Sequence, residues 1–210
     1  MSNSLEQHWD FVYKTKSPDE VSWTQETPEI SLKLIESLNL AKDAKVIDVG
    51  GGDSKLVDEL LALGYTDITV LDISRKALEK AKSRLGVLSE NVTWIVSDIN
   101  DFQPKESYDL WYDRAAFHFL ISEEEKQLYL SKVSKYTRNL ILGTFSDKGP
   151  FKCSGLQVQG YSQDAMNRFF DESFHNIKNI TQVHVTPFGS KQDFVFGVYN
   201  NKEPLLVNCK

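Results

Sequence analysis

The fold is decided by the stretch Val46-Ile47-Asp48-Val49-Gly50-Gly51-Gly52-Asp53-Ser54 of this 210-residue chain. The apolar residues that lead into it, from Lys45 to Val49, predict a short strand, which three consecutive glycines end. The next segment, 55–63, repeats apolar residues at helical spacing. Glycine allows positive φ and lets a ligand approach without a Cβ in the way, and a helix N-terminus presents unpaired N–H groups. Strand, glycine turn and helix together predict a nucleotide-binding loop.

The spacing of the glycines decides between nucleotides. A dinucleotide fingerprint needs Gly-x-Gly-x-x-Gly, but counting from Gly50 its third glycine position holds Lys55. Lysine cannot permit the close helix–strand packing of that position, so NAD and FAD are disfavoured. A Gly-x-x-x-x-Gly-Lys-Ser/Thr loop does not occur in the sequence. The alternative that the glycine turn serves only the fold stays open at this point.

The pattern Asp48-x-Gly50-x-Gly52-x-Ser54 resembles motif I of the class I S-adenosylmethionine (SAM)-dependent methyltransferases. That family usually has a glycine where this chain has Ser54, and serine is a good helix N-cap. The resemblance implies SAM as the cofactor and S-adenosylhomocysteine as the product. It places Asp48 near the amino-acid end of SAM, with Gly50, Gly51 and Gly52 along the cofactor.

Two further carboxylates follow predicted strands. Asp72 ends the strand 66–72 and lies 24 residues after Asp48, near the offset expected for an acid that accepts both ribose hydroxyls. The resemblance implies that Asp98, after the strand 92–96, holds the adenine amino group. The residues after these two acids, Ile73 and Ile99, are the expected apolar contacts of adenine. The alternative for either acid is a turn or cap residue at a strand end.

The pattern along the chain predicts an α/β fold. Strands alternate with helices over about one hundred residues, which is typical of a parallel, doubly wound sheet. The predicted strands are 45–49, 66–72, 92–96, 108–113, 139–144, 177–185 and 193–199. The predicted helices are 74–85, with Ser74 as its expected cap, 123–135, 163–171 and one that begins near Pro28. The last two strands resemble the methyltransferase ending. We therefore expect a mostly parallel seven-stranded sheet of order 3-2-1-4-5-7-6, with an antiparallel C-terminal hairpin and helices on both faces.

We expect one methyltransferase domain over residues 1–210. Its parts are an N-terminal helical and aromatic cap (1–40), a SAM-binding core (41–144) and an acceptor side (145–200). The chain carries a net charge of −6 and shows no Lys/Arg cluster, so nucleic acid is not an expected partner. Neither a membrane-length apolar window nor signal-peptide features occur. Two cysteines, Cys153 and Cys209, predict no disulfide framework, and we expect a cytoplasmic monomer or homodimer.

Two regions are expected to concern the substrate. Trp9, Tyr13 and Trp23 precede the first strand and have no obvious place inside a doubly wound sheet. We expect them to lie across the cofactor, with Trp23 as a cofactor-binding residue; the alternative is a flap that packs only on the sheet edge. This leader resembles a methyltransferase-like group that includes enzymes acting on elongation-factor lysines. The long connection 145–161 is the expected wall of the acceptor site.

Three residues are candidates for the reaction itself, namely Arg114, His118 and His184. Asp113 precedes Arg114 at a strand end, where open α/β sheets place ligands, and is counted with the cofactor residues. Each histidine has the alternative of a structural role. The candidates lack the spacing of a zinc site, and no metal is expected. No nucleophile elbow is visible, which argues against a hydrolase.

The chain as a whole resembles a subgroup of small methyltransferase-domain proteins whose substrate is unassigned. We expect transfer of a methyl group to a small-molecule acceptor by in-line displacement. A protein lysine is the second choice of acceptor, and a neutral or anionic acceptor suits Arg114 better. A non-catalytic SAM-binding module and an NAD-linked oxidoreductase are the competing classes.

Overall fold

A computed structural model describes residues 2–203 of the chain. These residues fall into two compact units. Unit 1 comprises the described part of Met1–Phe102 together with Val185–Lys191, and unit 2 comprises Gln103–His184 with the described part of Gln192–Lys210.

The strands of unit 1 are parallel. They are β1 (Lys45–Val49), β2 (Asp67–Asp72) and β3 (Val92–Val96), and β2 pairs with both others. β1 and β2 are almost entirely buried, whereas β3 is only partly so. Val49 lies opposite Leu71, and Asp72 lies opposite Val96, so the three strands end at one edge. Near-continuous apolar runs suit strands that are covered on both faces. The motif loops that follow these strands are thereby brought together.

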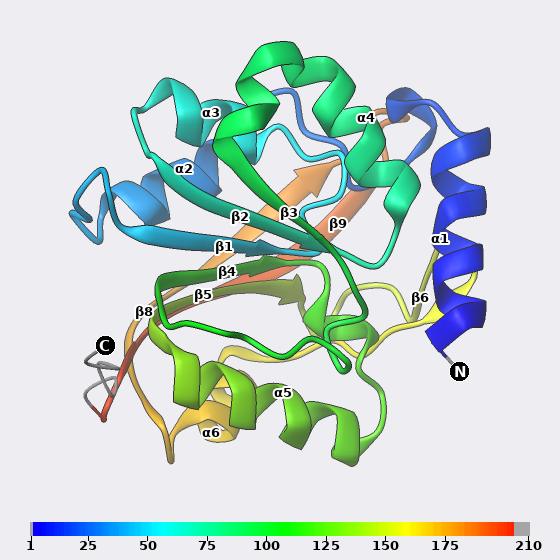
Figure 1. The fold of residues 1–210 in the computed structure, drawn as a ribbon. Coiled ribbons are helices and arrows are strands. Elements are labelled where there is room, and N and C mark those ends of the chain that lie inside the picture. The colour runs from blue at the N-terminus through cyan, green and yellow to red at the C-terminus, as the bar shows by residue number, and fades with distance from the viewer. Residues whose placement is uncertain (1, 204–210) are drawn as a thin grey trace. The chain divides into compact units, whose positions relative to one another are not determined.

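The helices of unit 1 are α1 (Ser2–Thr15), α2 (Glu29–Glu36), α3 (Leu56–Ala62) and α4 (Arg75–Leu85), with the 3₁₀ turns η1 (Pro18–Glu20) and η2 (Gly86–Asn91). Three of them, α2, α3 and α4, lie where the sequence indicates, whereas α1 had no predicted bounds within the expected N-terminal cap. Ser74 caps α4 as expected, because its Oγ accepts a hydrogen bond from the backbone N of Ala77 at 3.1 Å. α3 and α4 pack on β2, and α1 lies beside α4 (Figure 1).

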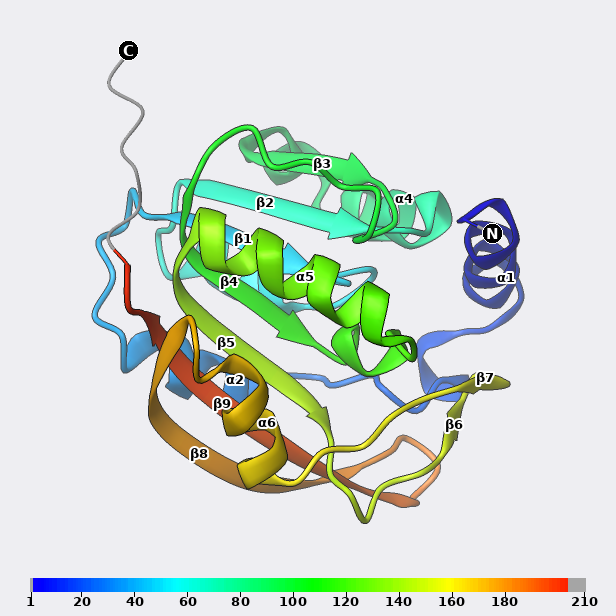
Figure 2. The same cartoon turned by 90° about the horizontal axis from the view of Figure 1, so that it is seen from below.

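Unit 2 combines two parallel strands with an antiparallel hairpin. Its strands are β4 (Tyr108–Arg114), β5 (Thr137–Phe145), β6 (Lys152–Cys153), β7 (Leu156–Gln157), β8 (Phe174–Val185) and β9 (Lys191–Asn201), the last two with their Val185 and Lys191 ends in unit 1. Its helices are η3 (Phe117–Phe119), α5 (Glu123–Tyr136) and α6 (Gln163–Phe170). Figure 2 shows α5 running along β4 and β5. The core is aromatic: Phe170, for example, is fully buried and lies 5.3 Å from the ring of Tyr199.

The expected fold class is confirmed. The strands form one seven-stranded, mostly parallel sheet of order β3-β2-β1-β4-β5-β9-β8, and β9 runs antiparallel to β5. This is the expected order 3-2-1-4-5-7-6, because the short strands β6 and β7 form a separate two-stranded sheet and shift the numbering by two.

Two local expectations were wrong. Ser54 is not the N-cap of α3, which begins one residue later with Lys55 at that position; Ser54 Oγ instead accepts from the backbone N of Leu56 at 3.1 Å. The connection 145–161 also contains the β6–β7 hairpin, which was not expected. Its turn residues Ser154 and Gly155 have φ of 50° and 82°, and two successive residues of positive φ suit a tight hairpin.

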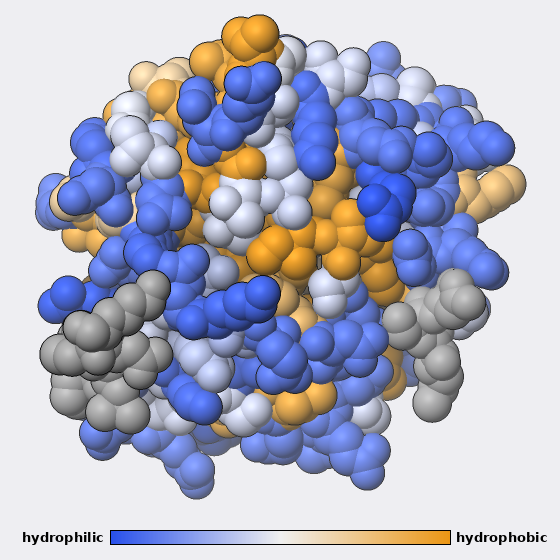
Figure 3. All heavy atoms as spheres, viewed as in Figure 1, coloured by the Kyte–Doolittle hydropathy of each residue, from blue (hydrophilic) through white to orange (hydrophobic). Residues whose placement is uncertain are grey.

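The face shown in Figure 3 is mostly hydrophilic. Hydrophobic residues interrupt it at the upper edge and, over a wider area, near the middle of the view. In the 3₁₀ turn η2, Val87 is 82% and Leu88 is 50% exposed. Within residues 2–203, each helix is too short or too polar to span a membrane.

Candidate functional site

The glycine loop after β1 has backbone angles that glycine adopts more readily than other residues. Gly50 and Gly52 have φ of 68° and 49°, in the left-handed region. The backbone N–H groups of Gly50 and Gly51 donate to the carbonyl of Leu71, at 2.8 and 3.3 Å, which ties the loop to the end of β2. Ser54 N donates to the carbonyl of Gly51 at 2.8 Å and closes the turn.

Close packing explains the other requirement for glycine. A Cβ on Gly51 would lie 2.7 Å from Oδ2 of Asp48 and 2.7 Å from Cγ1 of Val70. A Cβ on Gly52 would lie 2.7 Å from the hydroxyl of Tyr13 and 3.1 Å from Oδ2 of Asp72. Gly52 is therefore the point where the loop faces the acid at the end of β2.

Asp72 is buried and acts as an acceptor for backbone groups. Its Oδ1 accepts from the backbone N of Ser74 at 2.7 Å, and the backbone of Gly52 also donates to it. Burial raises the pKa of Asp72 from its usual 3.8 to about 7, because it outweighs those hydrogen bonds, and the nearby charge of Asp10 adds to the rise. A carboxylate so placed has acceptor capacity for a vicinal diol.

Asp98 lies next to this acid. The backbone N of Ser97 donates to the carbonyl of Asp72 at 3.0 Å, which holds the two loops together. Oδ1 of Asp98 accepts from the backbone N of Asn100 at 2.9 Å, as in an Asx turn. Ile73 and Ile99 are both half-buried. The structure thus brings the predicted residues of the cofactor site in unit 1 to neighbouring loops.

The N-terminal aromatic residues form one cluster. The ring of Trp9 lies 5.7 Å from Trp23 and 6.4 Å from Tyr13, and Tyr13 lies 5.9 Å from Trp23. Trp9 and Tyr13 are four residues apart on α1 and so share one helix face. Because the Tyr13 hydroxyl lies beside Gly52, the cluster borders the glycine loop. The sequence predicted that these aromatic residues lie across the cofactor, but it did not indicate that Tyr13 is the residue beside the glycine loop.

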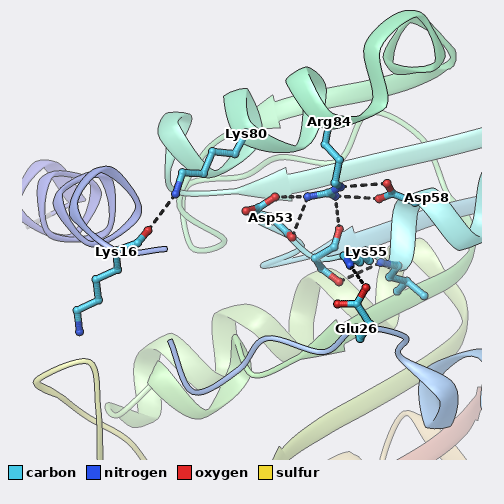
Figure 4. A network of polar contacts seen from close by, with 9 residues as sticks. Lys16, Glu26, Asp53, Lys55, Asp58, Lys80 and Arg84 are labelled. Carbon is cyan, nitrogen blue, oxygen red and sulfur yellow. Dashed lines mark hydrogen bonds and ion pairs between the residues drawn. The ribbon is translucent and has the colours of Figure 1, made fainter. Parts of the chain in front are cut away.

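Polar contacts hold α1 against α4. Oδ1 of Asp10 accepts from Ser74 Oγ at 2.7 Å and from the backbone N of Lys76 at 3.0 Å, at the N-terminus of α4. Lys80 Nζ donates to the carbonyl of Lys16 at 3.1 Å (Figure 4). No sequence motif indicated the role of Asp10, since an acid inside a helix has many uses.

In unit 2, Asp113 is engaged within its own surroundings. Its Oδ1 accepts from the backbone N of Ala116 and Phe117 at 3.1 and 3.2 Å, and its Oδ2 accepts from the hydroxyl of Tyr129 at 2.9 Å. Burial raises the pKa of Asp113 to about 6, against the effect of these donors. These contacts order the turn after β4. A contact between Asp113 and the cofactor stays a prediction.

His118 is fully buried in this turn. Its ring stacks on Phe145 at 4.4 Å, and its Nδ1 accepts from the backbone N of Phe145 at 3.4 Å. Burial, with the charge of Arg114 as the second cause, lowers the pKa of His118 to about 3. The imidazole is therefore neutral, and because Nδ1 accepts, Nε2 carries the proton. Among residues 2–203, Nε2 has no hydrogen-bond partner.

Arg114 and His184 meet at one aromatic ring. The guanidinium of Arg114 lies 4.9 Å from the centroid of Phe194, within the range of a cation–π contact. His184 is 5% exposed and meets the same ring edge-on at 6.2 Å. Phe194 also lies 4.8 Å from Phe145, the ring on which His118 stacks. The three predicted reaction residues therefore surround one aromatic pair.

The cysteines and the possible metal ligands lie as follows. Cys153 is buried in β6, and Cys209 lies outside the described residues. In the described part of the chain, no group of three or more His, Cys, Asp or Glu residues is arranged to hold a metal ion.

Comparison with known proteins relates part of this chain to a known family. The family model described as a methyltransferase domain matches residues 46–139, from β1 to the start of β5. The malonyl-[acyl-carrier protein] O-methyltransferase of Anoxybacillus flavithermus is 31% identical over 105 residues, which cover 49% of this chain and 39% of that protein. The matching part therefore spans about two fifths of that relative's length.

A second relative has a different kind of acceptor in its name. The eEF1A lysine and N-terminal methyltransferase of Mus musculus is 23% identical over 122 residues, 57% of this chain and 17% of that protein. The fold is also similar to the N-methyltransferase NodS of Bradyrhizobium japonicum, solved with S-adenosylhomocysteine. The TM-score is 0.67 at 17% identity, over 96% of this chain and 98% of that one.

The expectation drawn from motif I is confirmed by these findings. Residues 46–139 match a methyltransferase domain, and the sheet has the strand order expected for that fold. The loops after β1, β2 and β3 present the glycines and acids that the resemblance required. The matched part of the chain is therefore a methyltransferase domain, built on the class I SAM-dependent methyltransferase fold.

Proposed function

We propose that this protein transfers the methyl group of SAM to a small-molecule acceptor that carries an anionic or neutral group. The observation that carries the proposal is the gathering, in unit 1, of the glycine loop, Asp72 and Asp98 at the ends of three neighbouring strands. SAM supplies an electrophilic methyl group when bound. The chain's own residues bind and orient SAM and the acceptor, and they exclude water.

The cofactor roles follow from donors and acceptors. Asp72 accepts from the ribose hydroxyls, and Asp98 accepts from the adenine amino group, because carboxylates are acceptors and both partners are donors. The half-buried Ile73 and Ile99 supply the apolar contacts of adenine. Trp23 and its aromatic neighbours on α1 cover the loop.

The reaction needs alignment more than a reactive side chain. A nucleophile displaces the methyl group in line, and holding the reacting atoms roughly 3–3.5 Å apart is worth up to ~7–11 kcal/mol in well-oriented systems. No covalent intermediate with the protein is required. Residues at the acceptor therefore act mainly by placing it.

His118 suits a donor role and not that of a general base. Its Nδ1 accepts from the backbone N of Phe145, which leaves the ring proton on Nε2, and its low pKa keeps the ring neutral. An acceptor that is already ionised, such as a carboxylate or thiolate, needs no base. The guanidinium of Arg114 favours such an anion and disfavours a lysine ammonium.

The names of the relatives fit both candidate acceptors. One is a malonyl-[acyl-carrier protein] O-methyltransferase, and another acts on eEF1A lysine and N-terminal amine by its name. We keep a protein lysine as the second candidate for that reason. The charge of Arg114 supports the first.

Release of S-adenosylhomocysteine from SAM, measured over a panel of carboxylates, thiols, amines, halides and candidate proteins, tests the proposal. We expect turnover with a small anion, slowed at least tenfold by Arg114→Ala and His184→Ala while SAM affinity stays within a few-fold. Transfer only to protein lysines would establish the second candidate. Loss of SAM binding in both variants would move these residues to the cofactor site.

A thermal-shift comparison separates the competing classes. Stabilisation by SAM and S-adenosylhomocysteine, but not by NAD, supports the methyltransferase over an oxidoreductase. SAM binding without turnover on any acceptor would support a non-catalytic SAM-binding module. We also propose a cytoplasmic location and a monomer or homodimer, which cell fractionation and light scattering test.

A further inference from the structure

Arg84, in the last turn of α4, reaches back to the main chain that follows the glycine loop (Figure 4). Its Nη1 donates to the carbonyl oxygen of Asp53 at 3.2 Å, and its Nη2 donates to the carbonyl oxygen of Ser54 at 2.8 Å. Both acceptors are backbone atoms. Arg84 therefore fixes the backbone of residues 53 and 54 as well as the side chains that it binds.

The same guanidinium also binds two carboxylates. Nε and Nη2 donate to the two oxygens of Asp58, at 3.0 and 2.8 Å, and Nη1 pairs with the carboxylate of Asp53. Asp58 lies in the first turn of α3. A planar fork of donors makes this set of contacts possible, and a lysine ammonium cannot reproduce it. The ion pairs are partly exposed, so their effect on overall stability is small.

The loop needs such an anchor. Three consecutive glycines give it more conformational freedom than any other tripeptide, and ordering it costs entropy. At its start, the N–H groups of Gly50 and Gly51 are held by Leu71. At its end, α3 has only seven residues and its N-cap Lys55 makes no side-chain cap hydrogen bond. Arg84 supplies the attachment at that end.

We propose that Arg84 is a positioning residue for the cofactor: by holding the carbonyls of Asp53 and Ser54 it keeps the glycine loop in its binding conformation before SAM arrives. A ligand that must order a loose loop binds more weakly by the cost of ordering it. The inference rests on the proposed function only in taking SAM as the loop's ligand.

Calorimetric SAM binding to Arg84→Gln and Lys82→Gln tests this role. Both changes remove one positive charge from α4, but Lys82 lies over the ring of Trp94 at 5.5 Å and the structure records no contact between it and the loop. We expect Arg84→Gln to weaken SAM binding at least tenfold, with turnover at saturating SAM within twofold of the original protein. Lys82→Gln should bind SAM as the original protein does. Amide exchange at residues 50–54 should be faster in Arg84→Gln without ligand.

Arg84→Lys and Asp58→Asn complete the series. Arg84→Lys keeps the charge, and we expect it not to restore SAM affinity. Asp58→Asn leaves both carbonyl contacts in place and should weaken binding only a few-fold, and Arg84→Lys replaces Arg84→Gln as the test if the glutamine variant does not fold. Unchanged affinity in Arg84→Gln, equal losses in the two glutamine variants, or full rescue by lysine would overturn the positioning role. Absence of SAM binding by the unaltered protein would instead overturn the proposed function.

Discussion

The cofactor loops of unit 1 and the aromatic cluster of unit 2 are built in different ways. In unit 1, the polar groups come from segments that directly follow β1, β2 and β3, and backbone hydrogen bonds tie these segments together. In unit 2, Arg114 and His184 come from strands far apart in the sequence and meet at Phe194, on a third strand. The first kind of site is visible as a motif, whereas the second exists only after folding.

The buried acids of the two regions also differ in their hydrogen-bond partners. Asp72 is a buried acid whose pKa of about 7 leaves it close to titration. Asp113 is also buried and, like Asp72, accepts from two backbone N–H groups, but it accepts in addition from the hydroxyl of Tyr129. One acid has acceptor capacity to offer a ligand, while the other completes its own turn. The following variants test that difference.

Gly52→Ala should have the largest effect. Residue 52 has a left-handed backbone conformation, which disfavours a side chain. The added Cβ would also lie 2.7 Å from the Tyr13 hydroxyl and 3.1 Å from Oδ2 of Asp72. We expect SAM affinity to fall at least ~100-fold, which corresponds to ~2.7 kcal/mol. Gly64→Ala is the matched control, because Gly64 also has positive φ but its Cβ would meet nothing within 4 Å. Equal losses in both variants, measured by calorimetry, would mean that backbone strain alone decides the effect.

Tyr129→Phe should lower the stability of the protein and leave its affinity for SAM nearly unchanged. It removes the 2.9 Å hydrogen bond to the buried carboxylate of Asp113 and leaves one oxygen less satisfied. We expect the free energy of unfolding in urea to fall by ~1–3 kcal/mol, with SAM affinity within twofold. A strong loss of SAM affinity in the folded variant would show that Asp113 belongs to the cofactor site after all.

SAM affinity should depend on pH through Asp72. The ionised form accepts the ribose hydroxyls, so binding is favoured above the pKa of about 7 and opposed below it. If the bound form stays ionised, affinity rises about tenfold between roughly pH 6 and 8, since one protonation equilibrium gives at most tenfold per unit. Asp72→Asn should bind more weakly and lose this dependence. A flat profile in the original protein would remove Asp72 from the ribose assignment.

Asp10→Ala should give the smallest effect. It removes the acceptor that holds α1 to Ser74 Oγ and to the backbone N of Lys76. We expect a loss of ~1 kcal/mol in stability, as for a helix cap, faster amide exchange in α1 and a few-fold loss of SAM affinity. Asp19→Ala, an exposed acid of the same N-terminal segment, serves as the control. Unchanged exchange in α1 would show that its aromatic contacts suffice.

The sequence predicted most of the fold because the signals were local. Apolar runs and their breaks placed the main strands, and Ser74 capped α4 as expected. The β6–β7 hairpin was missed, since four strand residues around Ser154 and Gly155 are too few for a periodic pattern. The start of α3 was off by one residue, because two adjacent polar residues, Ser54 and Lys55, precede its apolar stripe.

The sequence by itself determined the resemblance to a methyltransferase domain, the glycine loop and the order of the acids, because each motif lies within a few residues of the strand that positions it. Only the tertiary structure decided which side chains join that loop. Tyr13 reaches it from α1, and Arg84 reaches it from the far end of α4, while Asp10 ties α1 to the start of α4. Only folding, too, gathered Arg114 and His184 around Phe194. Contacts between residues distant in sequence depend on how helices and strands pack, and packing leaves no local pattern in a single chain.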